Sequence, residues 1–282
     1  MFQSLSNSWS LVKASAAVLR ADKELMVFPV ISGVLSVVVL ITFAVPSVMA
    51  GLFDSTALAD SGIPVAGYIV GFLFYVVQYF VIFFCNTALV GAALIRLRGG
   101  DPTVGDGFRL ATSRVVPILG YAVIAATVGV ILNALSKRSG LIGKIVVSLV
   151  GLAWNLATFL VVPVLAAEDV GPMDAVKRSA EYLRKTWGEQ IVGTAGIGAV
   201  FGLISFGTVL AGMALFIAAA MTQSAPLMIA VAVGFVLTLM ALGLVSATLS
   251  GIYAAAVYRY AAEGQTGTFF SAELVRGAFQ PK

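Results

Sequence analysis

Six long runs of apolar residues, separated by short polar segments, make up most of the chain. The runs cover residues 25–52, 65–95, 115–135, 141–166, 191–222 and 226–257. A helix needs about 20 apolar residues to span a bilayer, and each run is long enough. Strands of a membrane barrel alternate apolar and polar positions over about ten residues, whereas the run AVAVGFVLTLMALGLVSATL does not. The pattern therefore predicts an all-α integral membrane protein with six transmembrane helices.

Three of the polar segments have the pattern of an amphipathic helix that precedes a pair of apolar runs. Their apolar stripes are Phe2, Leu5, Trp9, Val12, Ala16 and Leu19; then Val104, Phe108, Ala111 and Val115; then Val176, Ala180, Leu183 and Trp187. For the second we expect Asp101 as the cap and Pro102 as the first helical residue. Gly171-Pro172, with Asp174 in the first turn, predicts the start of the third.

The first and third of these helices resemble each other. VKASAAVLR, from Val12, and VKRSAEYLR, from Val176, are identical at six of nine positions. We interpret the chain as one membrane domain, residues 1–282, made of three units: 1–98, 99–167 and 168–258, with a cytoplasmic segment at 259–282. Each unit would be an interfacial helix followed by a hairpin of two spans. The alternative is that any two basic amphipathic helices look alike.

The basic residues predict the orientation in the membrane. All but three of the 17 Lys and Arg lie before the first run, between the second and third, between the fourth and fifth, or after the sixth. The positive-inside rule then places both termini in the cytoplasm. The exceptions are Lys137, Arg138 and Lys144, on the opposite side. The first run is too long for a signal peptide, so we expect it to stay uncleaved.

Composition narrows the function classes. The chain is 60% apolar and 11% charged, without histidine and with one cysteine, Cys85. A Ser-His-Asp triad and a histidine metal site are therefore excluded. The spans hold no ionisable residue away from their ends, so a proton relay has no carrier. We expect no enzymatic activity, no cofactor and no metal. Nucleic-acid binding is not expected either, because the basic residues sit where topology requires them.

Neutral polar residues inside the spans allow two interpretations. Gln78, Asn86, Asn155 and Thr158 could line a narrow path, or they could join helices by hydrogen bonds; the second is favoured. Glycines four apart, such as Gly67 with Gly71 and Gly198 with Gly202, would let helices approach closely. The pattern does not tell whether such faces pack within one chain or between copies.

The function that fits best is a non-enzymatic protein of the cytoplasmic membrane that acts through lipid or protein contacts. The residues expected to seat the helices among anionic lipid headgroups are Trp9, Lys13, Arg20, Lys177, Arg178, Arg184, Lys185 and Trp187. A second copy of the chain or another membrane protein is the further partner left open. The alternative function is a channel or facilitative transporter for ions or small molecules.

Two terminal stretches carry a family resemblance. SWSLVKASAAVLRADKELMVFPVISG, near the N-terminus, and YRYAAEGQTGTFFSAELVRGAF, near the C-terminus, resemble the ends of a prokaryotic six-span membrane protein family that is classed only as a domain of unknown function. The resemblance implies a bacterial or archaeal cytoplasmic membrane and a match over the whole chain. It supplies no activity, cofactor or site residue.

Overall fold

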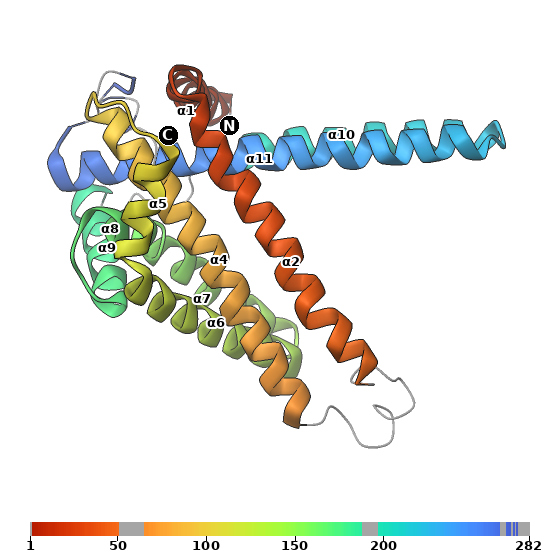
Figure 1. Ribbon diagram of the computed structural model, residues 1–282, viewed down its shortest axis with the longest axis horizontal. Helices are drawn as coiled ribbons and strands as arrows, with labels where there is room; N and C mark the ends of the chain where they lie inside the picture. The colour runs from red at the N-terminus through yellow and green to blue at the C-terminus, as the bar shows by residue number, and fades with distance from the viewer. Residues whose placement is uncertain are drawn as a thin grey trace. The chain divides into compact units, whose positions relative to one another are not determined.

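The structure is a computed structural model that describes residues 2–50, 65–187, 197–265, 269–271, 273 and 275. In these ranges every regular element is a helix, which confirms the predicted all-α class (Figure 1). The elements are α1 (Phe2–Ala21), the 3-10 turn η1 (Lys23–Met26), α2 (Val27–Met49), α4 (Val65–Leu97), α5 (Val104–Ser113), α6 (Val115–Arg138), α7 (Leu141–Ala157), α8 (Val161–Ala167), α9 (Pro172–Trp187), α10 (Ile197–Met221) and α11 (Ala225–Glu263).

Six stretches are helical, long and apolar enough to cross a membrane. They are Lys23–Met49, Val65–Leu97, Val115–Arg138, Leu141–Ala167, Val200–Met221 and Ala225–Glu263. These agree with the six predicted runs and make the chain a multi-pass membrane protein. The sixth helix continues past the predicted end at residue 257, and residues 191–196 of the fifth run lie outside the described part. The hairpin pairing and the sides of the termini stay predictions.

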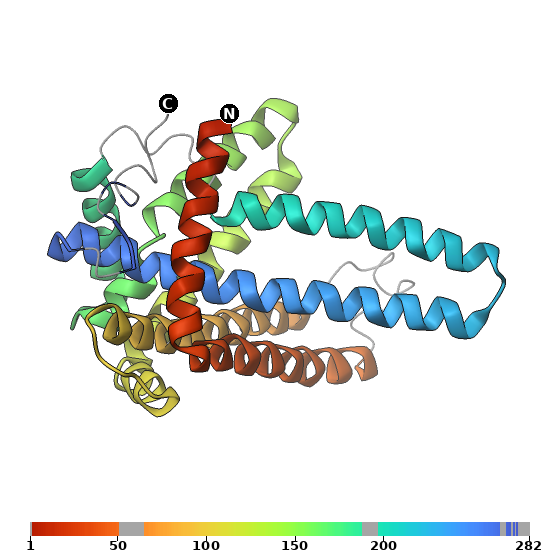
Figure 2. The ribbon, with the colours of Figure 1, turned by 90° about the horizontal axis from the view of Figure 1, so that it is seen from above.

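The chain divides into two compact units. The first unit comprises Met1–Met26, Ala93–Asp101 and Arg184–Lys282, and the second comprises Val27–Ala92 and Pro102–Leu183. In the first unit, α10 and α11 lie side by side and run in opposite directions, and α1 packs against both (Figures 1 and 2). In the second unit, α6 packs against α7.

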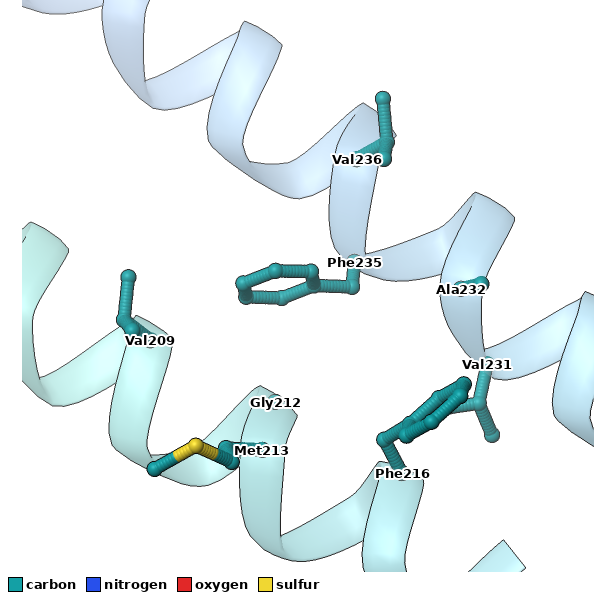
Figure 3. Close-up of a pocket in the computed structure, with 8 residues that line it drawn as sticks. All are labelled: Val209, Gly212, Met213, Phe216, Val231, Ala232, Phe235 and Val236. Atoms are coloured by element: carbon teal, nitrogen blue, oxygen red, sulfur yellow. The ribbon is translucent and has the colours of Figure 1, made fainter. Parts of the chain in front are cut away.

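One glycine sets the close approach of α10 to α11. A Cβ atom on Gly212 would stand 2.2 Å from Cδ2 of Phe235, so the ring occupies the place that a larger residue needs (Figure 3). Of the glycines singled out from the sequence, Gly71 and Gly202 have no atom within 4 Å of a Cβ placed on them. These two are not close-packing positions within this chain.

The short helix α5 is anchored in the second unit by small and aromatic residues. Ala111 is fully buried, and a Cβ on Gly107 would stand 2.7 Å from the backbone oxygen of Ala88. The ring of Phe108 lies 5.2 Å from that of Phe28 and 6.1 Å from that of Phe84. The predicted stripe through Phe108 and Ala111 therefore does face the protein.

The start of α5 differs from the prediction. The cap is Thr103, not Asp101, and the helix begins at Val104 rather than at Pro102. Thr103 and Asp106 form a capping box: each side chain accepts the backbone N–H of the other. This box satisfies two N–H groups that a helix start leaves open, while the Asp101 carboxylate pairs with Arg96 instead. Pro172 does begin α9, as predicted.

The fourth span is broken into α7 and α8. Helical geometry stops at Ala157 and resumes at Val161, so the break covers residues 158–160, three to five residues before Pro163. Proline has no N–H and its ring clashes with the carbonyl four residues earlier, here that of Phe159. The backbone N–H of Leu160, which the break frees, donates to Oγ of Ser179 at 3.0 Å, and both residues are fully buried. The break before Pro163 thus has a specific hydrogen-bond partner on α9.

Candidate functional site

Helix α9 turns a stripe of small and apolar side chains toward the protein. Ala175, Ser179 and Leu183 are at most 2% exposed, whereas Val176 and Ala180 of the predicted stripe are only half-buried. The buried stripe therefore lies about one residue away from the predicted one. The side chain of Trp187 lies outside the described residues. The charged face of α9 therefore stays exposed beside this buried stripe.

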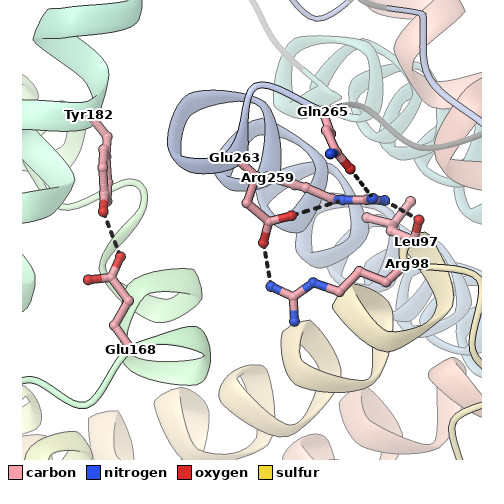
Figure 4. Close-up of polar contacts among 7 residues, drawn as sticks. All are labelled: Leu97, Arg98, Glu168, Tyr182, Arg259, Glu263 and Gln265. Atoms are coloured by element: carbon pink, nitrogen blue, oxygen red, sulfur yellow. Dashed lines mark hydrogen bonds and ion pairs between the residues drawn. The ribbon is translucent and has the colours of Figure 1, made fainter.

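Two of the four predicted cations on α9 are paired with acids. Nζ of Lys177 lies 3.3 Å from Oδ1 of Asp174, and Arg178 forms an ion pair with Glu168. The same carboxylate accepts a hydrogen bond of 2.8 Å from the Tyr182 hydroxyl (Figure 4). The hydrogen bond and the negative charge of Glu168 raise the pKa of Arg178. The pKa of Tyr182 is raised most by burial and then by the hydrogen bond to Glu168.

The other two cations of α9 are open. Arg184 and Lys185 are exposed in its last turn. Within the part of the chain that the structure describes, neither has a carboxylate oxygen within 4.0 Å. These two charges are therefore available to an external anion.

Helix α1, in the first unit, also buries one face and leaves its basic residues exposed. Leu11, Ser15 and Val18 are at most 1% exposed, and Val12 of the predicted stripe is also buried, at 7%. The buried face therefore overlaps the predicted stripe at Val12 and otherwise lies beside it. Trp9 is half-exposed at 46%, with Nζ of Lys13 5.9 Å from its ring centroid, a cation–π distance. Lys13 and Arg20 are exposed, and in the described ranges no acid pairs with either. The side chains of Phe2 and Leu5 lie outside those ranges.

A cluster of arginines in the first unit was not predicted. Arg259, 7% exposed, donates to the backbone oxygen of Leu97, to Glu263 at 3.2 Å and to Gln265 at 3.0 Å (Figure 4). Glu263 also pairs with Arg98. From the sequence, these arginines were used only to predict the orientation of the spans. The spacing of four residues between Arg259 and Glu263 is the pattern that could have predicted their ion pair. The contacts join the ends of α4 and α11 and leave the cluster a structural role.

The four neutral polar residues of the spans are not gathered at one cavity. Oγ1 of Thr158 donates to the backbone oxygen of Trp154, at the end of its own helix, at 2.8 Å. Asn155 is exposed, and Asn86 is half-buried. Oε1 of Gln78 is buried and has no hydrogen-bond partner among the described residues.

Two grooves between helices have other linings. One, of about 350 Å³, lies between α10 and α11 and is lined by Val209, Gly212, Met213, Phe216, Val231, Ala232, Phe235 and Val236 (Figure 3). Its walls are carbon and one thioether sulfur. The other, of about 650 Å³, lies between α4 and α6, and it combines glycines and aromatic rings with Lys137 and Arg138.

Comparison with known proteins gives a family but no activity. No curated protein and no solved structure matches the chain. The family match covers residues 65–269, so the N-terminal stretch that suggested the resemblance lies outside it, and the expected match over the whole chain is not found. Since the matched range is well over half of the 282 residues, the chain belongs to DUF6159, a family of unknown function.

Proposed function

We propose that this protein is a non-enzymatic component of a prokaryotic cytoplasmic membrane, with both termini in the cytoplasm, and that it acts by holding anionic lipids. The observation that supports this most directly is the set of open cations on α1 and α9: Lys13, Arg20, Arg184 and Lys185. Each helix buries its apolar stripe and leaves these charges exposed. In this proposal α1, α5 and α9 lie at the cytoplasmic interface, each ahead of a hairpin of two spans.

Charge arithmetic gives the size of the effect. A Lys or Arg near an anionic membrane surface contributes about 1 kcal/mol, which is about five-fold in a partition constant. Cations already paired with a carboxylate on the protein contribute less, because the pair carries little net charge. Arg109 with Asp106 and Lys177 with Asp174 are exposed pairs of this kind. Replacing both partners of a pair leaves the net charge unchanged, so the open cations and the Lys177–Asp174 pair make double variants with equal numbers of substitutions but different changes of charge.

The test compares two double variants in bilayers of phosphatidylcholine and phosphatidylglycerol. One is Arg184→Gln with Lys185→Gln, and the other is Lys177→Gln with Asp174→Asn, which removes a whole exposed pair. Spin-labelled phosphatidylglycerol and phosphatidylcholine report how many lipids of each kind the protein immobilises. We expect the open pair to lower the preference for phosphatidylglycerol several-fold and the paired control to change it little. Equal preference in the wild type and in the open-pair variant, and also after Lys13→Gln with Arg20→Gln, would refute the proposal.

The alternative, a channel or facilitator, is tested separately by solute flux. It requires Asn155 to face a path, and Asn155→Leu would then slow the leak of small solutes from liposomes that hold the protein. Flux equal to that of empty liposomes over a broad solute panel would remove this alternative.

A further inference from the structure

The groove between α4 and α6 is lined by aromatic rings and by glycines. At Tyr79 the lining meets a row of rings: Tyr79 stacks on Phe83 at 5.6 Å, and Phe83 lies 4.6 Å from Tyr121 of α6. Above this stack the walls lose their side chains at Gly67, Gly71 and Gly129. No atom lies within 4 Å of a Cβ placed on Gly71, and only the Tyr79 hydroxyl, at 3.7 Å, lies so near one on Gly129.

The dimensions of the groove suit one lipid chain. The lining stretch of α4 runs from Gly67 to Tyr79, which is about 18 Å at a rise of about 1.5 Å per residue. That length is close to half of the roughly 30 Å hydrocarbon core, or one leaflet. The volume of about 650 Å³ falls in the range of roughly 300–1,000 Å³ that is usual for small-molecule sites.

The mouth of the groove is both aromatic and cationic. Tyr68 and Tyr75, which are 65% and 46% exposed, line it together with Lys137 and Arg138 at the end of α6. Tyrosine is enriched at the membrane–water interface. In the described part of the chain neither cation has a carboxylate within 4.0 Å. Arginine and lysine are also the usual partners of phosphate.

These same two cations conflict with the positive-inside rule, since they fall in the hairpin predicted to face away from the cytoplasm. A ligand at the mouth of the groove gives them a reason to be there. We propose that the groove holds an anionic phospholipid of the outer leaflet, with its phosphate between Lys137 and Arg138 and one acyl chain lying along Gly71 and Gly129. This inference rests on the proposed lipid-binding function and on the proposed orientation, and it adds a defined site on the opposite side of the membrane.

Two pairs of variants separate charge from shape. Lys137→Gln with Arg138→Gln removes the phosphate contacts, and Lys144→Gln is its control, because Lys144 is an exposed cation of the same predicted side that does not line the groove. Gly71→Leu fills the groove. Its control is Gly33→Leu in α2, where a new side chain also meets no atom within 4 Å.

The experiment uses the full chain in nanodiscs that contain phosphatidylcholine and phosphatidylglycerol, the latter with a photoreactive diazirine on its acyl chain. After illumination, peptide mapping locates the cross-links, and native mass spectrometry counts the phosphatidylglycerol that stays bound. We expect cross-links on the lining residues of α4 and α6. The variant of Lys137 and Arg138 should weaken retention at least about ten-fold, the loss typical of one hydrogen bond to a charged group, and Gly71→Leu should weaken it by filling the groove. Both controls should retain lipid like the wild type.

The outcomes discriminate clearly. Unchanged retention and cross-linking in both groove variants would overturn this inference, and so would equal labelling by a phosphatidylcholine probe. Competition by soluble glycerol phosphate at the strength of the lipid would show that only a free phosphate is recognised, which also overturns it. If the groove variants retain lipid like the wild type while the variants of Arg184 and Lys185 still lower phosphatidylglycerol association, the proposed function stands and this inference fails. If only the groove variants lose lipid, the groove site stands and the proposed cytoplasmic lipid contacts fail.

Discussion

Single residues decide where the ends of helices are held. Arg259 has 7% of its surface exposed and bonds to a backbone oxygen at the end of α4 and to two side chains near the end of α11. Thr103 has a comparable role at the start of α5, although its side chain is far smaller. Its hydroxyl accepts the N–H of Asp106 at 3.2 Å. In both cases one side chain satisfies backbone groups that the helix cannot satisfy itself.

The Thr103 cap predicts a measurable loss of stability. Thr103→Ala removes the acceptor of the Asp106 N–H, and losing such a cap costs about 1 kcal/mol. Thr103→Ser keeps a hydroxyl in place and should stay close to the wild type. Thermal unfolding in detergent measures both. Equal melting temperatures of the Thr103→Ala and Thr103→Ser proteins would show that the capping box does not contribute to stability.

The same cap predicts a pH dependence with a definite sign. Hydrogen bonds from Thr103 lower the pKa of Asp106 from its ordinary 3.8. A depressed folded pKa gives stability that is present above the ordinary value and is lost as the pH falls through the folded one. The difference in melting temperature between the wild type and Thr103→Ala should therefore be full near neutral pH and shrink below about pH 4. A difference that grows in acid would contradict this assignment.

At the scale of elements, the fourth span shows how a break is tolerated in an apolar helix. Backbone groups freed inside a membrane need a partner, because no water is present to provide one. Here α9 supplies it, because Oγ of Ser179 accepts the N–H of Leu160. The polar side chain of Ser179 thus forms part of the helix packing.

Removing the Ser179 hydroxyl should destabilise the protein more than removing an exposed one. Ser179→Ala leaves the buried N–H of Leu160 without an acceptor, at a cost of about 1–3 kcal/mol. The control is Ser113→Ala, because the Ser113 hydroxyl only donates to the nearby backbone oxygen of Leu110 at an exposed position. Thermal unfolding compares the two. Equal melting temperatures would mean that another group satisfies Leu160.

At the scale of the whole molecule, orientation controls both proposals. The open cations of α1 and α9 act on the cytoplasmic leaflet only if the termini are cytoplasmic. The groove between α4 and α6 opens to the other leaflet only under the same condition. One arrangement in the membrane therefore links the two lipid sites.

Cysteine labelling tests that arrangement against a silent background. The native Cys85 is 1% exposed, so a membrane-impermeant maleimide should not label the wild type. On intact cells we expect Ser139→Cys, between α6 and α7, to react, and Lys185→Cys to react only after the cells are lysed. The opposite pattern would reverse the topology and move the groove to the cytoplasmic leaflet.

The sequence alone determined the number, type and approximate bounds of the spans. Apolar length is a local property that the bilayer requires of any spanning helix, so residues 65–95 predict α4 without knowledge of its neighbours. The start of α9 at Pro172 and the break before Pro163 were also predictable, because the effect of proline on the backbone is local too.

Only the tertiary structure decided which faces pack and which charges stay open. Arg178 and Arg184 look alike in the sequence, yet Glu168, at the end of α8, pairs with Arg178, and no described acid pairs with Arg184. Gly71 and Gly212 are both glycines in apolar helices, but the ring of Phe235 fills the space beside Gly212, whereas Gly71 lines an open groove. Such differences depend on what a second helix brings to within a few ångströms, and periodicity along one helix carries no information about its neighbours.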